Sequence, residues 1–376
     1  MPATPRPPRA APRRGLAAVA VVPLLMAVLA SCLGYGSQAV TDEVKVAPEG
    51  PKLSADTVRV GYFANLTHGT ALVGDREGFF QKELRGTALR TSVFNAGPSA
   101  VEALNAGSVD IAFMGPSPAV NGYVRSGGDS LRIVGGAASG GVRLVVNPDR
   151  IASPADVKGK RIATPQLGNT QDVAFLDWAA SQGWRIDPQS GKGDVSVLRV
   201  DNKILPDAYR SGSVDGAWVP EPVASRLVAQ GAKVLLDEAS LWPDERFAIT
   251  NIVVARGFLA EHPDVVEAVL RGAVRANAWI GAHPKQAKDA ANAQLRKLNG
   301  KPLPGAVLDS AWPSLRFTDD PLARTLHEQA DHAVKAGLLE RADLSGIYDL
   351  RLLNKILKSE NRPEVTDAGR GTKQSP

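Results

Sequence analysis

From Thr57 onward, short apolar runs alternate with longer stretches in which apolar residues recur at helical spacing. The predicted strands are 58–63, 88–94, 109–114, 161–164 and 247–254, and the predicted helices are 71–84, 98–106, 155–158, 173–182, 263–281, 322–339 and 350–357. Helices of about 10 to 15 residues separate several of these strands, so we expect an α/β fold of mainly parallel sheets flanked by helices on both faces.

A repeated segment indicates two lobes of similar build. Residues 103–113 (ALNAGSVDIAF) recur as 208–218 (AYRSGSVDGAW). In each copy a glycine, Gly107 or Gly212, is expected to end a helix in the left-handed conformation before a strand begins. A turn that contains proline follows each strand and is expected to open a helix. The alternative is a chance recurrence of a common cap-and-strand sequence.

The carboxyl ends of the strands are the expected ligand site, because helix N-termini there offer unpaired N–H groups to anions. The loop at 165–172 (PQLGNTQD) adds hydroxyl and amide donors between a strand and a helix. It lacks the Gly-Lys-Ser/Thr ending of a phosphate-binding P-loop, which argues against an ATPase. A plain polar turn is the alternative interpretation of this loop.

The excess of positive charge lies at the beginning of the chain. The formal charge is +5, but residues 1–31 hold four arginines and no acid, and from Cys32 onward 40 basic residues face 39 acidic ones. Aromatic residues make up 5% of the chain, and they do not interleave with basic runs. This pattern argues against nucleic-acid binding.

The first 31 residues have the pattern of an export signal. Arg13 and Arg14 precede an uncharged run at 16–30, which is shorter than the roughly 20 residues that a membrane span needs. The run ends in LASC, which resembles a bacterial lipoprotein signal, so we expect lipid on Cys32, the single cysteine. A chance cysteine is the alternative, and both Sec and twin-arginine export remain open.

The histidines do not form a catalytic or metal-binding pattern. None of the five (His68, His262, His283, His327 and His332) has the spacing of zinc ligands, and no nucleophile, base or metal cluster is evident. We therefore expect neither catalysis nor a cofactor or metal. Only His68 is well placed for function, in a loop with Asn65 and Thr67, and a satisfied loop histidine is equally compatible with the sequence.

Four segments resemble those of the periplasmic substrate-binding proteins of the aliphatic sulfonate, taurine and nitrate ABC importers: 61–68 (GYFANLTH), 94–98 (FNAGP), 107–110 (GSVD) and 163–172 (ATPQLGNTQD). The resemblance spans about residues 57–355. It implies a two-lobe periplasmic-binding-protein fold (type II) with a hinged cleft, which closes on a small molecule and delivers it to a membrane permease driven by a separate ATPase subunit.

With this resemblance, the chain is expected to act as a monomer that a lipid anchors to the outer face of the cytoplasmic membrane. The expected parts are a signal peptide (1–31), a lipid-attached linker (32–55), lobe 1 (56–142), lobe 2 (143–243), a return to lobe 1 with C-terminal helices (244–358) and a flexible tail (359–376).

The resemblance also implies which residues line the cleft: Asn65, Thr67, His68, Gly115, Pro116, Ser117, Ser139, Gly140, Gln166, Gly168, Asn169, Thr170, Gln171, Trp218 and Glu221. Backbone N–H and hydroxyl donors would hold a sulfonate, and Trp218 would cover an apolar part of the ligand. Glu221 departs from a purely anionic site, since its carboxylate repels a sulfonate unless it faces a basic group, binds an amine or points to solvent.

The expected ligand is a small organosulfur anion, either an aliphatic sulfonate or taurine. The alternatives are nitrate, an aromatic heterocycle such as a thiamine-pyrimidine precursor stacked on Trp218, an enzyme built on the same fold, and a surface interaction lipoprotein with an empty cleft.

Overall fold

A computed structural model describes residues 39–45, 50–340 and 343–371. The chain divides into two compact units, 1–35 and 36–376, and all described residues belong to the second unit. The expected signal peptide and Cys32 lie outside the described residues. Within the described ranges, no helix is both long and apolar enough to cross a membrane.

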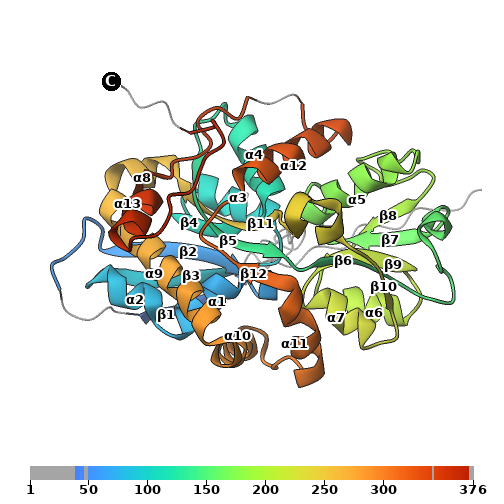
Figure 1. The fold of residues 1–376 in the computed structure, drawn as a ribbon, viewed down its shortest axis with the longest axis horizontal. Helices are drawn as coiled ribbons and strands as arrows, with labels where there is room; N and C mark the ends of the chain where they lie inside the picture. Colours follow the sequence, from blue (N-terminus) through green and yellow to red (C-terminus); the bar gives the residue numbers. More distant parts are fainter. Residues whose placement is uncertain (1–38, 46–49, 341–342, 372–376) are drawn as a thin grey trace, which may run out of the picture. The chain divides into compact units, whose positions relative to one another are not determined.

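Seven strands form the sheet of lobe 1 (Figure 1). Their spatial order is β1 (Ala39–Lys45), β3 (Ala88–Phe94), β2 (Thr57–Phe63), β4 (Ile111–Met114), β11 (Ala248–Ala255), β5 (Leu131–Gly140) and β12 (Leu315–Phe317). Five strands form the sheet of lobe 2, in the order β10 (Lys233–Asp237), β6 (Val142–Val146), β9 (Gly216–Pro220), β7 (Arg161–Thr164) and β8 (Ser196–Arg199). The two sheets confirm the expected α/β build of two lobes.

The sheets are mixed, so the expectation of mainly parallel sheets is wrong. β2 pairs in parallel with β3 and β4, and β7 with β8 and β9. β11 runs antiparallel to β4 and β5, and β6 runs antiparallel to β9 and β10. The reason lies in the crossings between lobes. β6 and β11 enter their sheets from the other lobe, so they start at the edge where their neighbours end.

Helices cover both sheets (Figure 1). They are α1 (Gly69–Arg76), α2 (Phe79–Leu84), α3 (Gly97–Asn105), α4 (Pro116–Arg125), α5 (Thr170–Ser181), α6 (Leu205–Arg210), α7 (Val223–Val228), α8 (Arg256–Glu261), α9 (Pro263–Ala282), α10 (Pro284–Asn299), α11 (Gly305–Ala311), α12 (Ala323–Lys335) and α13 (Arg351–Ser359). Short 3-10 turns are η1 (Leu66–His68), η2 (Pro154–Val157), η3 (Glu238–Leu241), η4 (Pro243–Glu245) and η5 (Trp312–Ser314). The helix expected at 71–84 is divided in two, because Gly78 adopts a φ of 72°.

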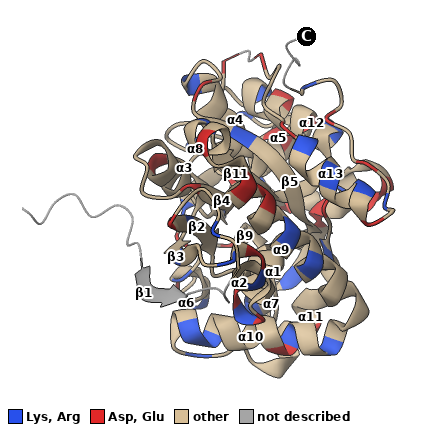
Figure 2. Cartoon of the chain, turned by 90° about the vertical axis from the view of Figure 1, so that its left-hand side faces the viewer, with Lys and Arg blue, Asp and Glu red and all other residues tan. Residues whose placement is uncertain are grey.

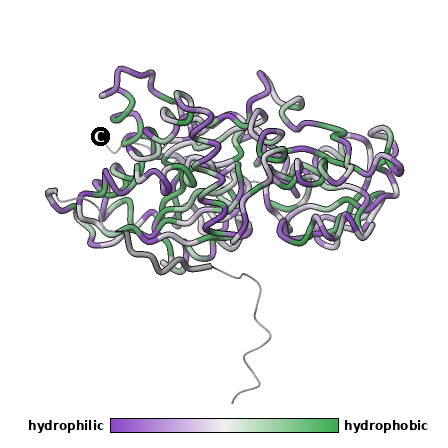
Figure 3. Tube along the Cα trace, turned by 90° about the horizontal axis from the view of Figure 1, so that it is seen from below, coloured by the Kyte–Doolittle hydropathy of each residue, from purple (hydrophilic) through white to green (hydrophobic). Residues whose placement is uncertain are grey.

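Each lobe has its own apolar interior. The large cluster of lobe 1 joins the faces of its sheet to α1, α9 and α10, whereas the clusters of lobe 2 join its sheet to α5 and α7. Apolar segments accordingly run through both lobes (Figure 3). Basic and acidic residues are interspersed along the ribbon in Figure 2, in keeping with the near-neutral charge after Cys32.

The repeat in the sequence recurs in three dimensions. Gly107 and Gly212 have φ values of 65° and 71°, the left-handed conformation expected at the end of a helix. β4 and β9 follow these glycines, and the prolines after the two strands stand at the beginnings of α4 and α7. Each lobe therefore presents a strand that runs into a helix start, as the repeat predicted.

A matching pair of buried carboxylates fixes the start of each repeated strand. Asp110 Oδ2 accepts hydrogen bonds from the backbone N–H (2.8 Å) and Nε (3.0 Å) of Arg59. Asp215 Oδ2 accepts the same two bonds from Arg161, at 2.9 and 3.1 Å. Both aspartates are buried, so Asp110 ties β2 to β4 and Asp215 ties β7 to β9. The Asp of the Gly-Ser-Val-Asp sequence thus has a structural role in both copies.

We expect Asp215→Asn to lower the free energy of unfolding at pH 7 by about 1–2 kcal/mol, because it removes a buried carboxylate that accepts hydrogen bonds from two half-exposed arginines. Burial alone would raise the pKa of Asp215, but hydrogen bonds from Arg161 and Arg150 outweigh burial and hold the pKa well below its usual range. Because this pKa is lower in the folded protein than the unfolded value of about 4, the ionised carboxylate stabilises the fold at pH values above about 4. The difference in free energy of unfolding between the wild type and Asp215→Asn should therefore shrink as the pH falls below 4.

Urea unfolding from pH 7 to pH 3 measures this difference. The control is Asp207→Asn, which removes an exposed ion pair with Arg210 and should change stability by less than about 0.5 kcal/mol. A loss for Asp215→Asn no larger than that of the control would contradict the structural role of the repeated aspartate.

Candidate functional site

A small cavity lies between the lobes, at the carboxyl ends of the central strands. Its lining residues from lobe 1 are Phe63, Asn65, Thr67, His68, Asn95, Ala96, Gly97, Gly115, Pro118 and Ile249, and those from lobe 2 are Asn169, Thr170, Gln171, Asn202 and Pro220. We call it the inner cavity. Its free volume of about 30 Å³ suits a group of a few heavy atoms, since one water needs roughly 10–15 Å³.

The turn after β2 supplies the wall from lobe 1. Asn65 precedes η1, and Thr67 and His68 lie within η1. The Thr67 carbonyl accepts a hydrogen bond from Thr250 Oγ1 (2.9 Å) on β11, which fixes the turn against the sheet. Leu66 N–H donates to the carbonyl oxygen of Glu221 in lobe 2 (3.1 Å), so the same turn also contacts the other lobe.

His68 is a neutral hydrogen-bond donor at this wall. Burial lowers the pKa of His68 to about 3. The Phe63 N–H points at His68 Nδ1 (3.3 Å), so Nδ1 is the acceptor and the ring proton lies on Nε2. The Phe63 and His68 rings also stack, with centroids 4.2 Å apart. The side chain therefore offers an N–H group to the inner cavity without carrying a charge.

The start of α5 supplies the wall from lobe 2. Asn169 is the N-cap, and its Oδ1 accepts from the Asp172 N–H at 2.9 Å. Asp172 is fully buried and pairs with Arg199 Nε (3.0 Å), so its charge is neutralised beneath the loop. Thr170 and Gln171 occupy the first helical positions and line the inner cavity. The Oγ1 atom of Thr170 is buried and has no hydrogen-bond partner.

The two walls meet where Gly115 faces Thr170. A Cβ placed on Gly115 would lie 2.3 Å from Thr170 Oγ1, closer than any real contact. Gly115 has an ordinary φ of −69°, so the space, and not the backbone conformation, requires glycine here. Gly115 is also the N-cap of α4, and this contact therefore brings the start of α4 next to the start of α5.

Seven of the residues expected at the cleft line the inner cavity: Asn65, Thr67, His68, Gly115, Asn169, Thr170 and Gln171. Pro116 and Ser117 lie behind it in the first turn of α4, and the buried Ser117 hydroxyl has no partner. Gln166 and Gly168 lie in the loop before α5, outside the lining. Gly140 lines a separate cavity with Arg143, and Ser139 is a buried residue whose Oγ accepts from the Phe247 N–H (3.2 Å).

The expectation that Trp218 covers the ligand is wrong. Trp218 is fully buried in the core of lobe 2, against Phe175 and Trp178, and its indole donates to Glu238 Oε2 at 2.6 Å. The reason is the alternation of side chains along a strand, which directs this residue of β9 to the face that α5 covers.

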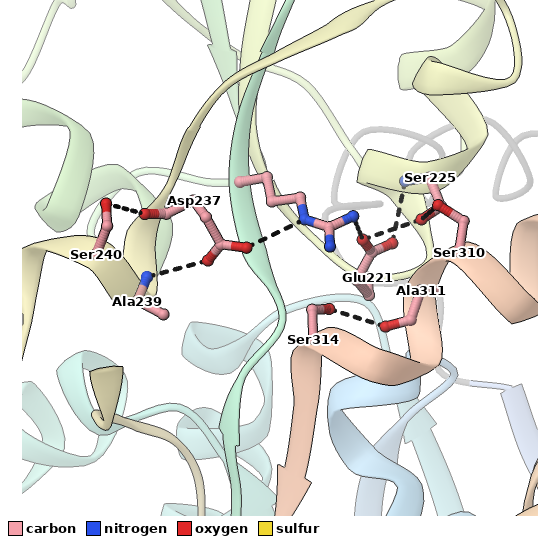
Figure 4. A network of polar contacts seen from close by, with 9 residues as sticks. Glu221, Ser225, Asp237, Ala239, Ser240, Ser310, Ala311 and Ser314 are labelled. Atoms are coloured by element: carbon pink, nitrogen blue, oxygen red, sulfur yellow. Dashed lines mark hydrogen bonds and ion pairs between the residues drawn. The ribbon is translucent and has the colours of Figure 1, made fainter. Parts of the chain in front are cut away.

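Glu221 does not line the inner cavity, but it does face a basic group. Its carboxylate is fully buried and accepts from Arg143 Nη1 (2.9 Å), and from the N–H and Oγ of Ser225 (both 3.0 Å). Burial raises the pKa of Glu221, although Ser225 and Arg143 favour the ionised form. Arg143 also donates to Asp237 (3.3 Å), and Ser225 continues the network to Ser310 (Figure 4). The carboxylate is therefore neutralised inside the protein and cannot meet a ligand amine.

Sequence reasoning missed several lining residues. Asn95, Ala96, Gly97 and Pro118 follow β3 or begin α4, and the Asn-Ala-Gly-Pro segment was a usable signal because it belongs to the family resemblance. Asn202 follows β8, a strand that the pattern did not reveal. Its Oδ1 is buried without a partner, like Thr170 Oγ1. The described part of the chain contains no group of His, Cys, Asp and Glu residues arranged for a metal ion.

Comparison with known proteins agrees with this geometry. The model of the NMT1-like family matches residues 52–295. The taurine-binding periplasmic protein of Escherichia coli (strain K12) is 30% identical over 265 residues, 69% of this chain and 79% of that protein. A putative binding protein of Brucella abortus (strain 2308) is 28% identical over 259 residues, 65% of this chain and 76% of that protein. The resemblance inferred from the sequence motifs is confirmed.

Solved structures share the fold. The alkanesulfonate-binding protein SsuA from Xanthomonas axonopodis pv. citri, bound to MOPS, superimposes with a TM-score of 0.62 at 22% identity, over 78% of this chain and 96% of that chain. The periplasmic nitrate-binding protein NrtA from Synechocystis PCC 6803 gives a TM-score of 0.69 at 16% identity, over 83% and 91%. These likenesses confirm the two-lobe periplasmic-binding-protein fold.

The lowered pKa of His68 predicts a pH-dependent stability. Between about pH 6.5 and pH 3 the unfolded chain binds a proton that the folded chain does not, so acidification destabilises the fold, by about 2 kcal/mol at pH 5 relative to pH 8. The His68→Gln variant has no side chain at this position that takes up a proton on unfolding. The free energy of unfolding of the wild type minus that of the variant should therefore fall by about 2 kcal/mol from pH 8 to pH 5.

Urea titrations at the two pH values measure this difference. Burial raises the pKa of Glu238 to about 7, but Glu238 titrates in both proteins and cancels in the comparison. His283→Gln, at an exposed position, is the control and should show no such change. A difference that is independent of pH would show that His68 is not held neutral by burial.

Proposed function

The chain belongs to the NMT1-like family, and from this premise we propose that it is the extracytoplasmic solute receptor of an ABC importer for a small organosulfur anion. It would bind an aliphatic sulfonate between its lobes and deliver it to a permease driven by a separate ATPase subunit. The periplasmic binding proteins among its relatives support this role, as does the predicted export signal.

The observation that carries the proposal is the unpartnered Thr170 hydroxyl in the inner cavity. A buried polar atom without a partner costs free energy, about 1–3 kcal/mol, unless a ligand or water satisfies it. Thr170 lies at the start of the twelve-residue α5, where N–H groups and the helix dipole favour an anion. The neutral N–H of His68 reaches the same cavity from lobe 1.

The charges around the cavity favour an alkanesulfonate over taurine. The inner cavity has no carboxylate among its lining residues, so an ammonium group would find no counter-charge there. Glu221, the candidate for that role, is already paired with Arg143. An aromatic heterocycle is also less favoured, because Trp218 is buried in the core and offers no stacking surface.

We further propose that a lipid on Cys32 holds the receptor, as a monomer, at the outer face of the cytoplasmic membrane. The Leu-Ala-Ser-Cys sequence supports this proposal. Ala39–Lys45 form β1 of the lobe 1 sheet, so the expected linker at 32–55 is wrong in part, and only residues 33–38 before β1 would act as the tether. Globomycin inhibits the peptidase that cleaves lipoprotein signals, so accumulation of the uncleaved form in its presence tests the proposal. Loss of membrane association in Cys32→Ser would agree with it, whereas an unchanged membrane fraction would contradict it.

Calorimetric titration of the mature protein tests the ligand class. We expect saturable binding of ethanesulfonate and weaker binding of taurine and nitrate. Thr170→Ala should weaken ethanesulfonate binding by about tenfold, the effect of one lost charge-assisted hydrogen bond. Thr366→Ala, an exposed position far along the chain, is the control and should leave the affinity unchanged.

Two results would contradict the proposal. Absence of heat and of any thermal shift with every sulfonate would overturn the ligand class. An unchanged affinity in Thr170→Ala would remove this hydroxyl from the site.

A further inference from the structure

A second, larger cavity adjoins the inner one. It has a free volume of about 420 Å³ and shares Asn65, Asn95 and Asn202 with the inner cavity. We call it the outer cavity. Its other lining residues are Ala64, Phe94, Leu295, Leu298, Asn299, Lys301 and Leu303 from lobe 1, and Asp201, Lys203, Pro222, Val223 and Arg226 from lobe 2. A ligand whose head group fills the inner cavity would therefore extend into the outer one.

The lining of the outer cavity is positively charged. Lys203, Arg226 and Lys301 line it against a single carboxylate, that of Asp201. Within the described part of the chain, none of the three basic side chains forms an ion pair. Asp201 Oδ1 accepts a hydrogen bond from the backbone N–H of Lys203 at 2.7 Å. A net positive charge is thus left facing the cavity.

Arg226 differs from the other partly buried arginines of lobe 2. Arg143 and Arg199 are each paired with a carboxylate that has no exposed surface, Glu221 and Asp172 respectively. Arg226 is partly buried in α7 without such a partner, and burial lowers its pKa. A desolvated guanidinium without a counter-charge gains free energy when an anion binds beside it.

We propose that the outer cavity binds a second anionic group of the ligand, so that the preferred solute is a sulfonate that also carries a carboxylate. This inference rests on the proposed function, because it assumes that the sulfonate occupies the inner cavity. Arg226 holds the second group, and Lys203 and Lys301 add to the field. Leu295, Leu298 and Leu303 line the outer cavity from lobe 1 and contact the carbon atoms between the two charges.

The arrangement also explains discrimination against zwitterions. The ammonium group of taurine would lie at the same distance from the sulfonate as the proposed carboxylate, and it would face like charges. Interactions between the second charged group of the ligand and the basic side chains of the outer cavity weaken with added salt, whereas the hydrogen bonds of the inner cavity are shielded from solvent. The preference for a dianion should therefore decrease as the ionic strength rises.

Calorimetric titration of the mature protein with matched pairs of ligands tests the proposal. The pairs are sulfoacetate with ethanesulfonate, and 3-sulfopropanoate with propanesulfonate. At low salt, the dianion of at least one pair should bind about tenfold more tightly than its monoanion, and taurine should bind more weakly than ethanesulfonate. In Arg226→Gln the affinity gain of the dianion over its monoanion should fall to less than about twofold. The affinity for the monoanion should stay within about twofold of that of the wild type.

A second variant keeps the proposal testable if Arg226→Gln does not fold. It combines Lys203→Gln with Lys301→Gln, both at exposed positions. This double variant should reduce the affinity gain of the dianion without changing the affinity for the monoanion. Lys285→Gln, an exposed residue at the opposite end of α10 from the outer cavity, is the control and should preserve the gain.

The outcomes separate the two proposals. Monoanions that bind as tightly as their dianionic partners, or a gain that survives both variants, would overturn the second anionic site and leave the sulfonate receptor standing. Failure of every sulfonate to bind would overturn the receptor proposal and this inference with it.

Discussion

The contact between Gly115 and Thr170 is the constraint on which the binding site depends. It brings the start of α4 in lobe 1 next to the start of α5 in lobe 2, and it leaves no room for a side chain at position 115. Donors that are distant in the chain, such as His68 and Thr170, thereby converge on one small cavity. The lining of the inner cavity is therefore divided between the two lobes and is complete only where they meet.

Four buried carboxylates near the strand starts and the lobe contact are paired with arginines, and none of the described residues that line the inner cavity carries a charged side chain. Asp110 and Asp215 are paired with arginines at the strand starts, Asp172 is paired below the α5 loop, and Glu221 is paired beside the lobe contact. Because these charges are satisfied internally, the proposed anion site relies on oriented N–H groups, hydroxyls and helix ends. The outer cavity differs, because its basic side chains have no carboxylate partners among the described residues.

Local patterns predicted the elements that position the site. Strands 88–94 and 161–164 begin and end as expected, and the Gly-Ser-Val-Asp repeat is a true structural repeat. The pattern does not show which face of a strand each side chain occupies, so it gives no check on the family resemblance, which implies that Trp218 lies in the cleft although the side chain is buried in the core. It also could not reveal Arg143 as the partner of Glu221, since the two residues are 78 positions apart and meet only when β6 pairs with β9.

A crystal structure of the ethanesulfonate complex, with the ligand sulfur located by anomalous scattering, tests the central claim most directly. We predict the sulfur in the inner cavity, with sulfonate oxygens within hydrogen-bond distance of Thr170 Oγ1 and His68 Nε2. A sulfur bound elsewhere, or a sulfonate held by a charged side chain without contact to Thr170, would contradict the claim that neutral donors from both lobes form the anion site.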